Sequence, residues 1–94
     1  MTRTMKNKPE KTELFVSVFW SPYFGQAGFQ GGAAAVSSEN KVGKFDILPE
    51  HTNFISLIFN KLTIDLLDKK KIDYSFNRGV LEVSENLVKV FLGI

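Results

Sequence analysis

The sequence predicts an all-β domain, a β-sandwich or flattened barrel of seven to nine short strands. Three observations favour this class. Apolar and polar residues alternate with a period of two in segments such as Lys61 to Leu67, these segments are rich in β-branched and aromatic residues, and turn signals separate them at short intervals. A chain of 94 residues without cysteine suits one domain with one core, and it excludes a disulfide framework or a thiolate metal site.

The expected strands follow one another along most of the chain. They cover residues 14–20, 33–37, 45–48, 54–59, 61–67, 72–76, 79–83 and 87–92. Residues 23–32 are rich in glycine and are expected to form a loop or a distorted edge strand. Turns are expected at residues 38–43, 68–70, 77–79 and 84–86. A helix over Asn53 to Leu66 is the one alternative, because Phe54, Leu57 and Ile58 fit a helical stripe, but the β-branched residues there favour a strand.

Charge is distributed unevenly along the chain. The net charge is +2, and residues 1–13 supply it, since four basic residues there face Glu10 and Glu13. Residues 14–94 are neutral, which argues against a nucleic-acid-binding body. The first 13 residues are expected to be a disordered basic tail, without the apolar segment of a signal peptide, and residues 14–94 to be the folded domain. No apolar stretch is long enough to predict a transmembrane helix.

Catalytic and cofactor-binding patterns are absent from the sequence. His51 is the only histidine, so it has no second histidine or cysteine with which to hold zinc. Asp65 and Asp73 would face each other across a hairpin, but on the polar side of their strands, where a solvated surface is expected. The glycines from Gly25 to Gly32 lack the lysine and helix of a phosphate loop, and Lys69 to Lys71 fit a solvated hairpin tip. The sequence therefore predicts no enzyme activity, no cofactor and no metal.

The first expected strand is apolar on both sides. Phe15 and Phe19 alternate with Leu14, Val16 and Val18, which are expected to face the core. Either both sides are buried between two sheets, or the two phenylalanines lie on an uncovered face that binds a partner.

Four segments, in order, resemble one known family. They are residues 14–22, the Gly-x-Ala-x-x-Val-like run in residues 31–37, the run Gly-Lys-Phe-Asp-Ile-Leu-Pro-Glu-His at residues 43–51, and the closing hairpin at residues 77–88. Together they resemble the N-terminal β-sandwich domain of the epsilon subunit of F-type ATP synthases. The resemblance implies a flattened sandwich of about eight to ten strands without a C-terminal helical hairpin.

The resemblance also implies a function and partners. Epsilon subunits are non-catalytic rotor subunits of the central stalk that bind the gamma subunit and the membrane c-ring, and they couple ion flow to ATP synthesis. The implied localisation is cytoplasmic, peripheral on the inner face of the plasma membrane. The implied gamma contacts are Ser21, His51 and Thr52. The implied c-ring contacts are Ser38, Glu39, Asn40, Lys41, Val42 and Lys44.

The sequence departs from the family at three places. Lys44 stands where an acidic residue often occurs, and Pro49-Glu50 stands where the family often has Pro-Gly. Epsilon subunits usually continue into two helices that bind ATP or act as an inhibitory arm, whereas this sequence stops at Ile94, because it is either naturally short or trimmed. A free-standing β-barrel that binds single-stranded nucleic acid or a protein ligand is the alternative function, supported by strand aromatics and the basic tail. A small enzyme centred on His51 is the third hypothesis.

Overall fold

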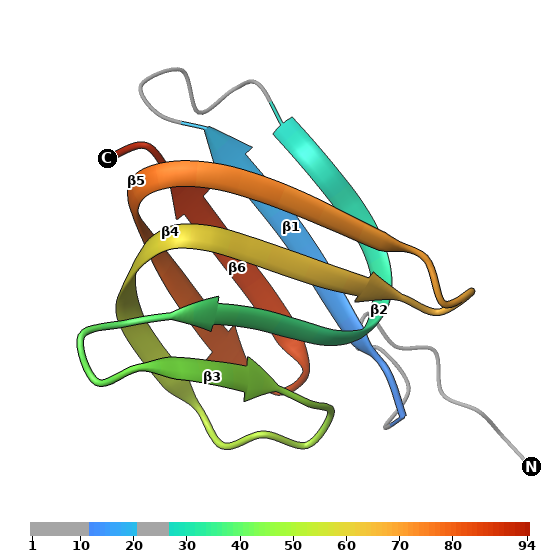
Figure 1. Cartoon of the computed structure of the whole chain (residues 1–94). Coiled ribbons are helices and arrows are strands. Elements are labelled where there is room, and N and C mark those ends of the chain that lie inside the picture. Colours follow the sequence, from blue (N-terminus) through green and yellow to red (C-terminus); the bar gives the residue numbers. More distant parts are fainter. Residues whose placement is uncertain (1–11, 21–26) are drawn as a thin grey trace, which may run out of the picture.

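The computed structural model describes residues 12–20 and 27–94, and within those residues it contains strands and turns but no helix (Figure 1). The strands are β1 (Leu14–Trp20), β2 (Ala27–Glu39), β3 (Lys44–Ile47), β4 (Phe54–Leu66), β5 (Lys71–Ser84) and β6 (Leu87–Leu92). The predicted all-β class is confirmed. The helical alternative for residues 53–66 is wrong, because that segment forms β4. The expected tail lies almost wholly outside the described residues.

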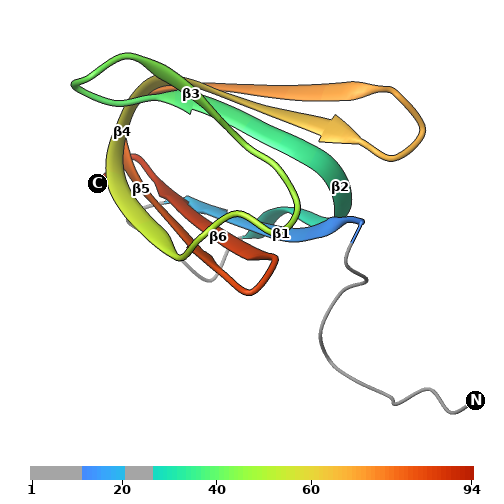
Figure 2. The ribbon, with the colours of Figure 1, turned by 90° about the horizontal axis from the view of Figure 1, so that it is seen from below.

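The strands close into a flattened barrel of two layers. Their order is β1-β6-β5-β4-β2-β3, and β1 also pairs with β2, which joins the sheet to itself. The pair β1–β6 is parallel, and the other pairs are antiparallel. Seen from below, β1 and β6 lie in one layer and β3 lies in the other, while β4 curves from one layer to the other (Figure 2).

Three long strands replace several of the predicted short ones. β2 and β4 have 13 residues each and β5 has 14, and each pairs with different neighbours along its length. The predicted strands 54–59 and 61–67 are therefore two halves of β4, and 72–76 and 79–83 are two halves of β5. Residues 27–32, expected to belong to a loop or a distorted edge strand, form the first half of β2, which pairs with β1 with a register shift between Ser17 and Phe19.

A β-bulge in the middle of β5 allows its two halves to belong to different layers. Phe59 pairs with Arg78 and Asn60 with Phe76, so Asn77 is an extra residue without an opposite partner. One extra residue reverses the side to which the following side chains point. The inward side is accordingly formed by even-numbered residues up to Phe76 and by odd-numbered residues from Gly79. The predicted turn at residues 77–79 is thus wrong: the bulge interrupts the alternation in the way a turn does.

Gly79 is required where β5 passes this bulge. A Cβ atom at that position would lie 2.6 Å from the carbonyl oxygen of Phe91 on β6. The two backbones can approach this closely only without a side chain. β2 has a similar irregularity, since Ala33 pairs with Leu66 and Ala35 with Asp65, which leaves Ala34 as the extra residue.

The core is apolar and continuous between the two layers. Its buried residues are Leu14, Val16, Val18, Ala33, Val36, Ile47, Ile58, Leu62, Ile64, Leu81, Val83, Val88, Val90 and Leu92. Trp20 packs at its edge, with its ring 5.9 Å from that of Tyr74 in an edge-on arrangement. The Tyr74 hydroxyl accepts a 3.0 Å hydrogen bond from the backbone N–H of Phe29, which links β5 to β2. None of the described residues belongs to a helix that could cross a membrane.

Gly79→Ala is expected to lower the free energy of unfolding by roughly 1–3 kcal/mol, because the added methyl group overpacks against the β6 backbone. Urea denaturation measures the change. Ser75→Ala, at an exposed position on the same strand, is the control and should leave stability nearly unchanged. Equal midpoints for the two variants would contradict the close approach at Gly79.

Candidate functional site

One outer face of the barrel is apolar. It is formed by outward side chains of β1, β6, the second half of β5 and the first half of β4, and we call it the apolar face: Phe15, Phe19, Ile55, Leu57, Val80, Leu87 and Phe91. The strand register places Leu57, Val80, Phe91 and Phe19 in one row across the four strands. The row lies perpendicular to the strands and spans the width of the sheet.

The apolar face is open to solvent. Ile55 is 69% exposed, Leu57 46% and Phe15 41%. The rings of Phe19 and Phe91 stack with centroids 5.3 Å apart and planes at 18°. Of the two interpretations of Phe15 and Phe19, the structure thus supports the uncovered face. A contiguous patch of large apolar residues on a small domain is typical of a protein-binding surface.

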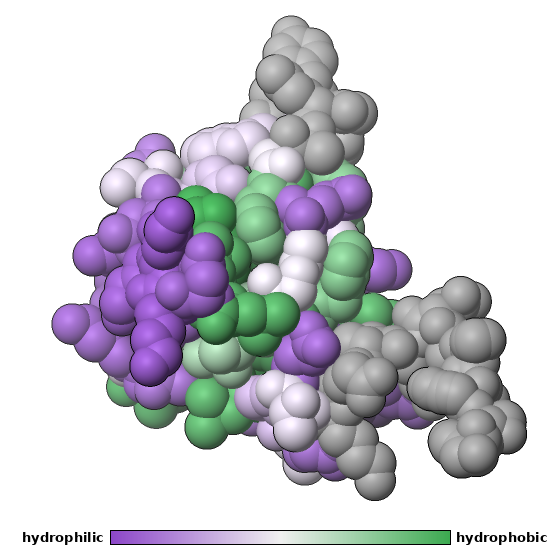
Figure 3. Space-filling model, turned by 90° about the vertical axis from the view of Figure 1, so that its right-hand side faces the viewer, coloured by the Kyte–Doolittle hydropathy of each residue, from purple (hydrophilic) through white to green (hydrophobic). Residues whose placement is uncertain are grey.

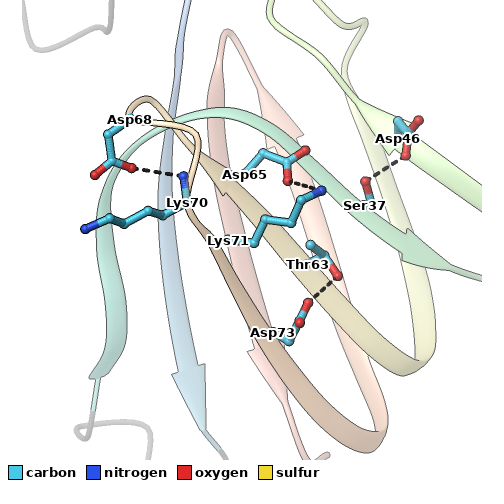
Figure 4. Close-up of polar contacts among 8 residues, drawn as sticks. All are labelled: Ser37, Asp46, Thr63, Asp65, Asp68, Lys70, Lys71 and Asp73. Carbon is cyan, nitrogen blue, oxygen red and sulfur yellow. Dashed lines mark hydrogen bonds and ion pairs between the residues drawn. The ribbon is translucent and has the colours of Figure 1, made fainter.

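The other layer presents a polar face whose groups are mutually paired (Figure 4). Ser37 donates to Asp46 Oδ1 at 2.7 Å, and Thr63 donates to Asp73 Oδ1 at 2.6 Å. Asp65 lies opposite Lys71, not opposite Asp73 as expected, and its Oδ1 is 3.2 Å from the Lys71 ammonium. That oxygen is buried and makes no directional hydrogen bond, so the Lys71 ammonium compensates its negative charge. The carboxylates of Asp65 and Asp73 are therefore not directly opposite each other, and the solvated surface expected for these strands remains the better interpretation.

An open depression of about 570 Å³ lies on this polar face. Its floor includes Ser37, Asp46 and Thr63, whose polar groups are already engaged in the bonds just described. No group of three histidine, cysteine or acidic side chains among the described residues could hold a metal ion. A solvated polar surface, as predicted for these strands, accounts for the depression.

Figure 3 shows hydrophilic residues gathered on the left of the view, and hydrophobic residues beside them that are interrupted by further hydrophilic ones. The tip of the β4–β5 hairpin contributes Lys69 and Lys70, both exposed, together with Asp68, whose carboxylate accepts a 3.1 Å bond from the Lys70 N–H.

His51 lies in the corner between β3 and β4. Its Nδ1 is 2.8 Å from the carbonyl oxygen of Thr52, and its ring lies edge-on to Phe54 with centroids 5.6 Å apart. The two contacting groups are a backbone carbonyl and a phenyl ring, neither of which is a nucleophile or a carboxylate, so the geometry gives no support to acid–base catalysis. Thr52 is exposed beside it. Ser21, the third expected gamma contact, lies outside the described residues.

Asn86 links this corner to the β5–β6 turn through a hydrogen bond. The turn has two residues, Glu85 and Asn86, both with positive φ, as in the tight hairpin turns typical of antiparallel strands. Asn86 is 8% exposed, and its Oδ1 accepts a 2.7 Å hydrogen bond from the N–H of Glu50. Its carbonyl oxygen accepts a 2.9 Å bond from Phe15 on β1. Through its side chain and its backbone carbonyl, Asn86 thus joins the corner, the turn and the first strand, a link between distant residues that sequence reasoning missed.

The turn between β2 and β3 projects from one end of the molecule (Figure 1). Lys41, Val42 and Lys44 are exposed, and Val42 reaches 95%. Ser38 differs from this group: it is 7% exposed, and its hydroxyl donates to the Lys61 carbonyl at 2.7 Å, so it supports the turn from within. Glu39 Oε2 accepts a 2.7 Å bond from Asn60.

Comparison with known proteins confirms the predicted resemblance. The sequence is 37% identical over 59 residues to the ATP synthase epsilon chain of a Nitratiruptor species, which is 62% of this chain and 46% of that relative. The chain therefore spans about half the length of the curated relative that it matches. No protein-family model matches the sequence.

Solved structures show the same fold. A chain of the Euglena gracilis mitochondrial ATP synthase structure, which contains OSCP, F1 and the c-ring, matches with a TM-score of 0.76 at 17% identity, over 97% of this chain and 56% of that one. A chain of the Tetrahymena thermophila mitochondrial ATP synthase central stalk and c-ring matches with a TM-score of 0.71 at 12% identity, over 94% of this chain and 67% of that one.

Glu50→Gly is expected to raise the free energy of unfolding by about 0.5–1 kcal/mol. Glu50 has φ of 74°, a left-handed conformation that a residue with a Cβ adopts at a cost, and glycine removes this strain. Urea denaturation measures the gain. Glu50→Ala keeps the Cβ and should leave the free energy of unfolding unchanged. An equal increase in both variants would refute the strain at this corner.

Asn86→Gly is expected to lower the free energy of unfolding by about 1–3 kcal/mol, because the Glu50 N–H loses its buried acceptor. Glycine tolerates the positive φ of 66°, so the backbone cost does not confuse the result. Lys69→Gly is the control, since Lys69 also has a positive φ but lies in an exposed turn. A loss of equal size in both variants would show that the Asn86 amide is not the stabilising group.

Proposed function

We propose that this chain is a non-catalytic central-stalk subunit of an F-type ATP synthase. In this role it binds the gamma subunit through its apolar face and meets the membrane c-ring through the β2–β3 turn, so that ion flow is coupled to ATP synthesis. The complex holds the chain at the inner face of the plasma membrane, and the chain itself performs no chemistry. The sequence similarity to an epsilon chain and the fold shared with two ATP synthase structures support this role.

The observation that carries the proposal is the exposed apolar face. Phe15, Ile55 and Leu57 are exposed there, and the other four side chains of the face are half-buried. Burial of apolar area is the main favourable term in protein association, at roughly 25 cal/mol per Å². On the polar face of the other layer, the carboxylates of Asp46, Asp65 and Asp73 are already paired within the chain, so this face offers a partner fewer unpaired groups.

Charge within the apolar face fits a protein partner. Glu82 on β5 and Lys89 on β6 lie directly opposite each other beside the apolar row, so their opposite charges offset each other. A surface that binds single-stranded nucleic acid would combine its aromatic residues with an excess of basic ones. Among the described residues of this face Lys89 is offset by Glu82, so they give the alternative function no specific support.

Two of the three expected gamma contacts, His51 and Thr52, lie just before β4, whose first half supplies Ile55 and Leu57. His51 is half-buried and packs on Phe54, and Thr52 is exposed beside it. We therefore assign both residues to the margin of the gamma interface, where polar residues usually surround an apolar centre.

Leu57→Lys is expected to weaken binding to the cognate gamma subunit by at least tenfold, because it replaces an apolar contact of about 1.5–3 kcal/mol with a charge that must lose water. Co-elution on size-exclusion chromatography and titration calorimetry measure the complex. Ser75→Lys adds the same charge on the polar face and serves as the control.

Both variants must retain the circular dichroism spectrum and the thermal midpoint of the unmodified chain. The proposal fails if the unmodified chain does not form a stoichiometric complex with gamma. The assignment of the apolar face alone fails if Ser75→Lys weakens the complex as much as Leu57→Lys does.

A further inference from the structure

We propose that, before assembly, the apolar face is covered by a second copy of this chain, in a two-fold symmetric dimer that the gamma subunit must displace. This inference rests on the proposed function, in which gamma binds the same face, and it adds a regulation of that face. Two features of the face specify the dimer: the apolar row described above and a charged row beside it.

The charged row is formed by the next outward side chains of the same four strands. The register aligns Ser17, Lys89, Glu82 and Ile55 across β1, β6, β5 and β4. Lys89 and Glu82 lie at the centre of the row, and both are exposed. The ion pair found between described residues lies elsewhere, on the polar face, and no ion pair closes between Glu82 and Lys89. Both charges are therefore accessible to a facing surface.

The face is complementary to itself under one two-fold rotation. Two copies packed face to face are related by an axis in the plane between them. An axis parallel to the strands, between β5 and β6, brings β5 against β6 and β4 against β1 of the second copy. Glu82 of each copy then faces Lys89 of the other, which makes two opposite-charge pairs. In the apolar row, Leu57 faces Phe19 of the second copy, so apolar side chains meet apolar ones.

The charges exclude the other two-fold arrangement of the same face. An axis that crosses the strands at a right angle would bring each strand against its own copy. Glu82 would then face Glu82 of the second copy, and Lys89 would face Lys89. Like charges in direct contact across an interface repel and cost several kcal/mol. The charged row thus fixes the direction of the axis, and the apolar row supplies the area that is buried.

The size of the face predicts a weak dimer. Four strands about 4.8 Å apart, with outward side chains about 7 Å apart along each strand, give a patch of roughly 20 Å on each side. Its area of roughly 400 Å² is about half of the 800 Å² per partner that is typical of stable complexes. Such a dimer dissociates readily, so it protects the apolar face without preventing a stronger partner from binding.

Sedimentation velocity of the full chain, from about 1 µM to about 1 mM, tests the dimer over the affinity range of weak interfaces. The unmodified chain is expected to form dimers as its concentration rises. Glu82→Lys should weaken the dimer at least tenfold, because the new side chain has the same charge as Lys89 of the second copy. Ser75→Lys adds the same charge on the polar face and should change the association less than twofold.

A mixture of two variants gives a second readout, which a merely structural effect would not produce. Glu82→Lys and Lys89→Glu each place like charges at the centre of their own dimer, so neither should associate alone. Mixed in equal amounts, they restore opposite charges at both central pairs and should form heterodimers. The two changes combined in one chain should associate like the unmodified chain. Circular dichroism must show that every variant keeps its fold.

Titration with the cognate gamma subunit connects the dimer to the proposed function. Gamma should convert dimers into complexes of one chain with one gamma subunit. A chain that stays monomeric at every concentration but binds gamma would overturn this inference and leave the proposed function intact. Equal effects of Glu82→Lys and Ser75→Lys, or a dimer that keeps both copies when gamma binds, would also overturn it. Failure of folded gamma to bind the chain would remove the proposed function and the displacement inferred from it.

Discussion

A single apolar core shared by two layers is the constraint on which the rest of the structure depends. A strand that passes from one layer to the other must turn its apolar side chains inward both before and after it bends. β5 meets this requirement with one extra residue at Asn77, and β2 with one at Ala34. Without these bulges, the second half of each strand would turn its apolar side chains towards water and its polar ones into the core.

The same constraint produces two unlike outer faces. Inward positions are mostly apolar, with Ser38 as an exception, so it is mainly the outward positions that are free to differ between the layers. In one layer they carry Phe19, Leu57 and Phe91, and in the other they carry the Ser37–Asp46 and Thr63–Asp73 pairs. The domain thus presents a surface suited to burial and a surface suited to water, on one small scaffold.

Local patterns allowed much of this fold to be predicted from the sequence. Alternation located the strands, and the polar residues at Asn40, Asp68 and Glu85 located three turns correctly. The bulge at Asn77 was mistaken for a turn, because both interrupt the alternation and both favour asparagine and glycine. The pairing of β1 with β6 and the bond from Glu50 to Asn86 depend on contacts between distant residues, which no local pattern contains.

The candidate site was predictable only in part, because a local pattern reveals the apolar side of one strand but not which strands lie beside it. Phe15 and Phe19 marked an apolar side of β1 from the sequence alone. Leu57, Val80 and Phe91 became part of the same face only through the register between strands.

The parallel pair in this sheet has a consequence for biosynthesis: Phe15 pairs with Leu87, so β1 lacks one neighbour until the last strand has left the ribosome. At roughly 5–20 residues per second this delay lasts several seconds. During that time the apolar run of β1 is the part of the nascent chain most open to mispairing.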